Sequence, residues 1–309
     1  MNVIEKLERL RIAYNRLIRI GGWIVGIGFL LFMADVLGLI NEVGVINGAG
    51  WIGILIVVGG LAVLGVAFSR YYFPFLQIYK GELIQSILAE NLEGYDDLRY
   101  FPEDGISKDT IESTGMMWMG NTYSSGDLIE GSYKGVEFRQ SDVCIEEVTY
   151  YNKSEHRETY LRGRWMIFDF NKRFRSDLQV CEKDFRYARA YGGPFSKGEK
   201  MHTLETESVA FNRAFTIAAE NDSEAFYILT PHFMEKLLEV KAKISGDLLF
   251  CFVDSQLHVA INDEYNNFEP NMAVPVDADR IRRSVWEDLE PITELINILR
   301  LDDRLFLTN

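Results

Sequence analysis

Residues 21–69 contain no lysine or arginine and only two acidic side chains, Asp35 and Glu42. In residues 70–309 acidic side chains outnumber basic ones by 42 to 27, and the 309-residue chain has a formal net charge of −14. Phosphate binding needs a net cationic face, so nucleic acid is excluded as the main partner. Only three cysteines are present. An odd number without paired spacing excludes a disulfide-built domain and suits a reducing compartment.

Two long apolar runs make up most of the uncharged part. Residues 20–40 are interrupted by Asp35 alone, and residues 51–68 carry no charge. As helices, these runs span roughly 27–32 Å, which is the thickness of the hydrocarbon core of a bilayer. A signal peptide has a shorter apolar region of about 7–15 residues, and two buried core helices are the other alternative. The lengths, with a glycine-rich connection at 41–50, predict a transmembrane helical hairpin over residues 20–69.

The charges that flank the hairpin predict its orientation. Five basic residues precede the first run, and Arg70 and Lys80 follow the second, whereas residues 41–50 contain no basic residue. Because cytoplasmic flanks carry an excess of lysine and arginine, both termini are expected in the cytoplasm. The sequence therefore predicts a multi-pass protein of the inner (plasma) membrane, with the lipid bilayer as its first partner.

Two features within the predicted spans have open interpretations. Asp35 is an intramembrane acid, which is a functional hypothesis by default, but it lies close enough to the end of its helix to reach the headgroups. Gly22 and Gly26 form a GxxxG pair that allows close helix packing. We expect this pair to pack against the second span in preference to forming a dimer seam.

The rest of the chain predicts an α+β fold. Residues 1–19 form an amphipathic cytosolic arm, and residues 70–97 form a membrane-proximal helix, whose apolar stripe favours pairing with the arm over lying on lipid. Residues 98–190 are beta-rich. Residues 191–309 read as a strand–helix–strand part with C-terminal helices. The expected architecture is a transmembrane helical hairpin followed by a cytosolic domain of mixed antiparallel sheet and helices.

Short extended runs broken by turn residues predict the strands. Asp254-Ser255 and Tyr133-Lys134-Gly135 suit hairpin turns. Thr230 as N-cap and Pro231 at the first position predict a helix that closes before Gly246. The strands are expected at residues 128–133, 136–140, 143–151, 160–171, 175–182, 214–220, 225–229, 247–253 and 256–261.

No catalytic, cofactor-binding or metal-binding residues are predicted. The glycines at 193 and 198 have the gap of a phosphate-binding loop, but Glu199-Lys200 follows where Lys-Ser/Thr is required. The four histidines are scattered, without an HExxH motif or a cysteine pair at metal spacing.

Two surfaces are candidates for binding. Met116, Met117, Trp118 and Met119 could form an apolar contact loop, or they could close the edge of a core. A basic stretch runs from Lys153 to Arg175, on an otherwise acidic body. Four of its arginines could face anionic lipid or an acidic partner, or they could form a solvated strand face balanced by nearby acids. These arginines are Arg162, Arg164, Arg173 and Arg175.

Several stretches resemble a known family. They are Leu-Glu-Thr-Glu at 204–207, Phe-Asn-Arg-Ala-Phe at 211–215, Asp-Ser-Glu-Ala at 222–225, Leu-Thr-Pro-His-Phe-Met at 229–234, Phe-Cys-Phe at 250–252, Gly-Ser-Tyr-Lys-Gly-Val at 131–136 and Arg-Gly-Arg-Trp at 162–165. The chain resembles the bacterial domain-of-unknown-function family 3137, whose members pair two N-terminal membrane spans with a cytosolic domain. The family implies no catalytic residues. Its genes often lie beside those of the LemA family of membrane proteins, which implies a LemA-like partner.

Three functions are therefore weighed. The first is a membrane-anchored cytosolic interaction module, an accessory subunit of an envelope assembly. The alternative is a sensor or binder of anionic lipid or of a small ligand. An enzyme with an unrecognised site is the least favoured.

Overall fold

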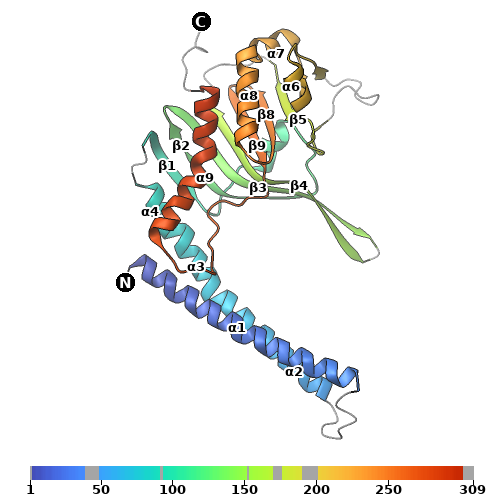
Figure 1. The fold of residues 1–309 in the computed structure, drawn as a ribbon, viewed down its shortest axis with the longest axis vertical. Helices are drawn as coiled ribbons and strands as arrows, with labels where there is room; N and C mark the ends of the chain where they lie inside the picture. Colours follow the sequence, from blue (N-terminus) through green and yellow to red (C-terminus); the bar gives the residue numbers. More distant parts are fainter. Residues whose placement is uncertain are drawn as a thin grey trace. The chain divides into compact units, whose positions relative to one another are not determined.

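The computed structural model describes residues 2–38, 49–90, 93–151, 153–169, 176–189 and 201–301 (Figure 1). The chain divides into two compact units. The helical unit contains Met1–Ser86 and Glu269–Arg283, and the sheet unit contains Ile87–Phe268 and Ser284–Asn309. The predicted α+β class, with apolar helices followed by an antiparallel sheet and further helices, is confirmed.

In the helical unit, α1 (Val3–Val36) and α2 (Ala49–Ala67) lie side by side (Figure 1). Asn2 caps α1, and the helix runs without a break from the basic arm through the first apolar run. Beyond α2 the chain stays helical, with two wider π-helical segments. The elements are η2 (Phe68–Tyr72), α3 (Phe73–Ile78), η3 (Tyr79–Ile84) and α4 (Gln85–Leu88).

Both long helices are apolar and mostly uncovered. In the most apolar 18-residue window of each, only 11% and 17% of the residues are buried. Trp23 and Trp51 are 74% and 75% exposed. A core helix of a soluble protein would be covered on most sides, because exposed apolar surface is costly in water. The two helices are long and apolar enough to cross a membrane.

Glycines form the contact between α1 and α2, but they are not the expected ones. A Cβ on Gly53 would lie 2.7 Å from the carbonyl oxygen of Gly28, so only glycine fits there. The expected packing of Gly22 and Gly26 against the second span is wrong, since a Cβ on either would meet nothing within 4 Å. Seven-residue spacing keeps small residues on one helix face, and the contacting glycines have it: Gly21 and Gly28, Gly53 and Gly60.

The amphipathic arm pairs with the helix that follows α2, as the sequence predicted. Leu7 is fully buried. The ring of Tyr14 lies 5.6 Å from that of Phe68 and 5.4 Å from that of Tyr72. This pairing leaves Arg16 and Arg19 exposed at the start of the first apolar run.

The same arm binds the backbone of the 269–283 segment. The carboxylate of Glu8 accepts a hydrogen bond from the N–H of Val276 at 2.8 Å. Asn15 donates its amide to the carbonyl of Met272 at 2.7 Å, and Arg11 donates to the same carbonyl at 3.3 Å. The helical unit is therefore completed by a segment from the far end of the sequence.

The sheet unit contains one antiparallel sheet, with nine strands within the described residues (Figure 1). Its order is β1-β2-β3-β4-β9-β8-β5-β7-β6, so strands from the predicted 98–190 and 191–309 parts share a single sheet. The strands are β1 (Tyr95–Phe101), β2 (Thr122–Tyr133), β3 (Val136–Tyr151), β4 (Ser154–Asp169), β5 (Leu178–Glu182), β6 (His202–Leu204), β7 (Phe215–Ala219), β8 (Asp247–Val253) and β9 (Gln256–Asn262).

Both faces of the central strands are covered. On one face lie α6 (Val209–Ala214), α7 (Asp222–Ile228), α8 (Pro231–Lys243) and residues 284–299 of α9 (Ala278–Leu299) (Figure 1). The Phe233 ring of α8 packs 5.9 Å from that of Phe252 on β8. Helix α5 (Lys108–Ser113) and the loop after it cover the other face. This double coverage explains why five consecutive residues are buried in both β8 and β9.

Most predicted elements are confirmed, and one is wrong. The helix after Thr230 and both hairpin turns occur as expected, with Lys134 and Asp254 at positive φ. Residues 225–229, expected as a strand, lie mainly in α7, because Asn221 caps a helix there by accepting the N–H of Glu224. The expected strands at 136–140 and 143–151 are one strand, β3.

We predict that Gly53→Leu lowers the stability of the helical unit, whereas Gly59→Leu does not. Both glycines lie in α2, but a Cβ on Gly59 meets nothing within 4 Å. Overpacking at Gly53 should cost about 1–3 kcal/mol, while the gain in helix propensity is common to both variants. Thermal unfolding of the full-length chain in detergent, followed by far-UV circular dichroism, measures the difference. Equal melting of the two variants would contradict the glycine contact.

Candidate functional site beside helix α9

Arg164 of β4 lies at the centre of a buried polar network in the sheet unit. Its guanidinium forms an ion pair with Asp263 and lies 5.2 Å from the ring centroid of Tyr265. Only about a tenth of each charged side chain is exposed, so the pair is strengthened by its low-dielectric surroundings. The preceding residue must be glycine, because a Cβ on Gly163 would collide with the carbonyl oxygen of Ile261 on the neighbouring strand.

Asp288 receives two hydrogen bonds in this network. The hydroxyl of Tyr265 donates to one carboxylate oxygen at 2.8 Å, and the N–H of Phe268 donates to the other at 2.9 Å. Asp288 is 1% exposed. Burial raises the pKa of its carboxyl to about 6, although the two hydrogen bonds and Arg164 act in the opposite direction.

The segment from Asp263 to Phe268 is held from two sides. Asp142 of β3 accepts hydrogen bonds from the backbone N–H of Asn267, at 2.6 Å, and from its side-chain amide. Asp288 of α9 holds the next residue, and the Phe268 ring packs 5.1 Å from that of Tyr100. Glu264 and Phe268 have positive φ, a conformation that is unfavourable for side chains with a Cβ. The carboxylates therefore hold the strained segment that follows β9.

The chemistry of this network is that of a proton-holding and positioning cluster. It combines carboxylates, a phenol, an amide and a guanidinium. Within the described ranges, no group of three or more His, Cys, Asp or Glu side chains is arranged to hold a metal ion. Three of its members, Arg164, Asp263 and Tyr265, line a cleft.

Two clefts flank α9. The first has a volume of about 590 Å³ and is lined by Arg164, Tyr265, Lys243 and three glutamates of α9. The second has a volume of about 370 Å³ and is lined by the rings of Tyr95, Tyr133 and Trp286 with Glu93. Glu287 and Glu290 line both clefts. Helix α9 is thus a ridge with an aromatic hollow on one side and a mixed polar hollow on the other.

The ridge is negatively charged. Glu287, Glu290 and Glu294 are three and four residues apart, which places them on one side of the helix. Glu294 lies 3.7 Å from Lys243, whereas Glu93, Glu287 and Glu290 form no ion pair with any residue that the structure describes. Carboxylates and aromatic faces both attract cations, so the clefts are suited to positively charged groups.

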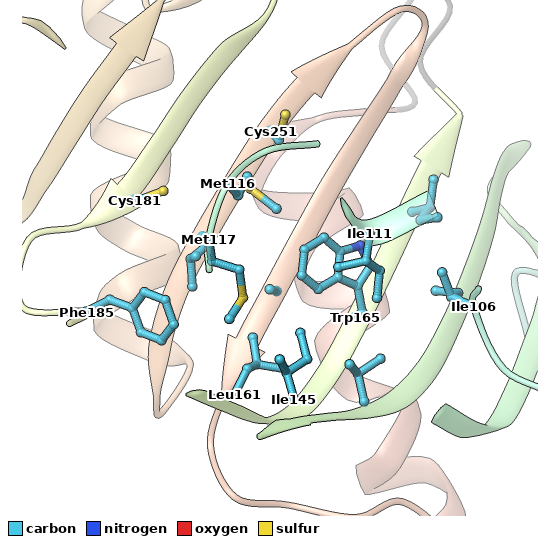
Figure 2. Close-up of a cluster of buried hydrophobic side chains, with 14 residues drawn as sticks. Ile106, Ile111, Met116, Met117, Ile145, Leu161, Trp165, Cys181, Phe185 and Cys251 are labelled. Atoms are coloured by element: carbon cyan, nitrogen blue, oxygen red, sulfur yellow. The ribbon is translucent and has the colours of Figure 1, made fainter. Parts of the chain in front are cut away.

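The methionine loop is mostly core (Figure 2). Met116 and Met117 are 1% and 5% exposed and lie over the sheet near Trp165 and Phe185. The backbone N–H of Trp118 donates to the carbonyl of Tyr187, and the Trp118 side chain is 58% exposed. Met119 is partly buried against the same cluster. Of the two alternatives, burial favours the edge of a core, and Trp118 alone presents a large apolar surface.

The four arginines of the predicted basic patch are not all described. Arg162 lies 3.4 Å from Glu146, and Arg164 is paired with Asp263. Arg173 and Arg175 lie outside the described residues. Carboxylate pairing weakens the field of two of the four cations, and lipid binding by the set stays a prediction.

The C-terminal part of the chain matches a known sequence family. Residues 159–301 match the sequence model described as "Protein of unknown function (DUF3137)". The match covers less than half of the 309-residue chain and supports the resemblance to the domain-of-unknown-function family 3137. The matched region contains Arg164, Tyr265 and Asp288 together with the glutamates of α9.

No curated protein matches the chain. Among solved structures, the chain is similar to the crystal structure of the mycobacterial trehalose monomycolate transport factor A, TtfA. The identity is 11%, the match covers 72% of this chain and 94% of that chain, and the TM-score is 0.37.

Sequence reasoning singled out Arg164 but missed its partners. Asp142, Asp263 and Asn267 carry no local motif. Asp288 did leave a signal: it lies seven residues after Ile281 and three after Val285, on the apolar stripe of a predicted helix. An acid on such a stripe is buried on folding and needs partners.

We predict that Asp288→Asn changes how stability depends on pH. With its pKa raised to about 6, the folded chain binds this proton more tightly than the unfolded chain does. The contribution to stability is present below the unfolded pKa of about 3.9 and is lost as the pH rises through 6. Relative to the variant, the wild type should lose on the order of 2–3 kcal/mol between pH 4 and pH 7.

Urea unfolding of the full-length chain in detergent, followed by tryptophan fluorescence at both pH values, measures this difference. His258, whose pKa burial lowers to about 4, acts in the opposite direction but is common to both proteins. Parallel pH profiles would show that Asp288 titrates normally in the folded chain.

Proposed function

We propose that this protein is a membrane-anchored interaction module whose helical hairpin crosses the inner membrane twice and whose sheet unit binds a partner protein in the cytosol. The observation that carries the proposal is the exposure of the two apolar helices. Trp23, Leu30, Trp51 and Leu55 are each at least 68% exposed, a state that lipid stabilises and water does not.

The glycine contact also favours a membrane hairpin. Close backbone approach through small residues is how helices associate in lipid, where the hydrophobic effect does not drive them together. Gly28 and Gly53 provide such an approach between α1 and α2. Exposed Arg16, Arg19 and Arg70 lie at the same end of the hairpin in sequence, as the positive-inside bias requires of cytosolic flanks.

The sheet unit supports the interaction part of the proposal. Its clefts are open and shaped by buried polar contacts, and they combine aromatic rings with charged rims, as protein interfaces do. An accessory subunit of an envelope assembly fits these features, and a LemA-like membrane protein stays the partner that the family resemblance implies.

The topology predicts a labelling pattern. In a variant with the native cysteines replaced, Asn47→Cys should react with a membrane-impermeant thiol reagent added to intact cells, because the positive-inside bias places the connection outside. Ser69→Cys should react only after the cells are opened. Reaction of a tag at residue 309 in intact cells would contradict the orientation.

The interaction role predicts a stoichiometric partner. When the tagged chain is purified from crosslinked native membranes, a second protein should be recovered in a fixed ratio. The chain itself should stay in the membrane pellet after an alkaline carbonate wash. Recovery of the chain alone after efficient crosslinking would contradict the proposed interaction role. Release of the chain by carbonate would contradict the proposed membrane anchor.

A further inference from the structure

The chain already places its own cations against the aromatic rings of both clefts. The guanidinium of Arg164 lies 5.2 Å from the Tyr265 ring in the first cleft. The ammonium of Lys134 lies 5.3 Å from the Tyr133 ring in the second. Two such contacts beside one helix show that the local field favours positive charge, since aromatic faces attract cations.

More negative charge surrounds the clefts than these cations neutralise. Arg164 is paired with Asp263, and Lys243 lies near Glu294 and Glu239. Glu93, Glu287 and Glu290 are exposed and form no ion pair with any residue in the described part of the chain. Their carboxylates stand beside the ring of Trp286, which is 39% exposed. The clefts therefore have carboxylates that no described cation neutralises and an aromatic ring that is partly exposed.

We propose that the two clefts flanking α9 bind lysine or arginine side chains of one basic segment on the partner protein. The proposal rests on the function proposed above and names the chemistry of its partner. Glu287 and Glu290 line both clefts, so one segment lying across the α9 ridge can place a cationic side chain in each hollow. The glutamates supply the charge pairing, and Trp286 supplies a ring face for one alkyl stem and its cation.

A segment suits this surface better than a metal ion. No group of three metal-ligating side chains occurs in the described residues, and aromatic walls do not coordinate divalent cations. The negative charge of residues 70–309 also steers a basic partner towards the chain. Complementary charge thus selects the occupant, and the rings fix where its cations lie.

The test uses full-length protein in a neutral detergent and fluorescein-labelled hexalysine as the probe, with fluorescence anisotropy as the readout. The wild type should bind the probe, and the double variant Glu287→Gln/Glu290→Gln should bind it about 3- to 10-fold more weakly. Trp286→Leu, which keeps an apolar side chain but removes the ring, should weaken binding about 2- to 5-fold.

The matched control is Glu112→Gln/Glu235→Gln. It makes the same change in net charge at exposed glutamates of α5 and α8, and it should change binding by less than about twofold, because salt screens remote charges. If both double variants weaken hexalysine binding equally, net charge alone explains the effect and the proposal is overturned. Binding of spermine without binding of hexalysine would overturn it in favour of a small polyamine.

The two proposals fail separately. If the native partner is still recovered at full yield with Glu287→Gln/Glu290→Gln, the clefts are not its docking site, and the interaction module stands. Loss of the partner from this variant, with full recovery in the control variant, supports the docking surface.

Discussion

Two carboxylates, those of the part-buried Asp142 and the buried Asp288, fix the route of the chain as it leaves the sheet. Asp142 and Asp288 hold Asn267 and Phe268 through their backbone N–H groups. Without these acceptors, the positive φ at Phe268 and the buried polar groups around it would be unfavourable. The bond from Phe268 to Asp288 also ties α9 to the segment whose Asp263 and Tyr265 line the first cleft.

A single guanidinium makes several of the contacts in this network. Arg164 serves at once as the partner of Asp263, as a cation over the Tyr265 ring and as a source of positive potential at Asp288. Such coupling means that single residues cannot be assigned separate energies. It also places the Asp288 carboxyl, whose pKa burial raises to about 6, against Tyr265 of the cleft wall.

Local sequence signals were sufficient to predict much of the fold. Thr230 and Pro231 determine where α8 begins, and the turns at Lys134 and Asp254 close hairpins between apolar strands. These signals were insufficient where two of them competed. Residues 225–229 have strand-forming side chains, yet the cap at Asn221 and packing on the sheet make most of them helical. The glycine contact was missed for a related reason, because a GxxxG spacing does not say which side of a helix meets its neighbour.

By itself, the sequence determined the two apolar helices, their flanking charge, the α+β class and a resemblance to family 3137 that the match over residues 159–301 supports. These follow from composition, period and short motifs, which act between residues close in the chain. Only the tertiary structure decided that Arg164, Tyr265 and Asp288 meet, and that glutamates of α9 border aromatic rings from β1 and β2. Most of those contacts join residues more than a hundred positions apart, although Tyr265 and Asp288 are only 23 apart. The order of strands in the sheet, which no local pattern encodes, is what brings the distant residues together.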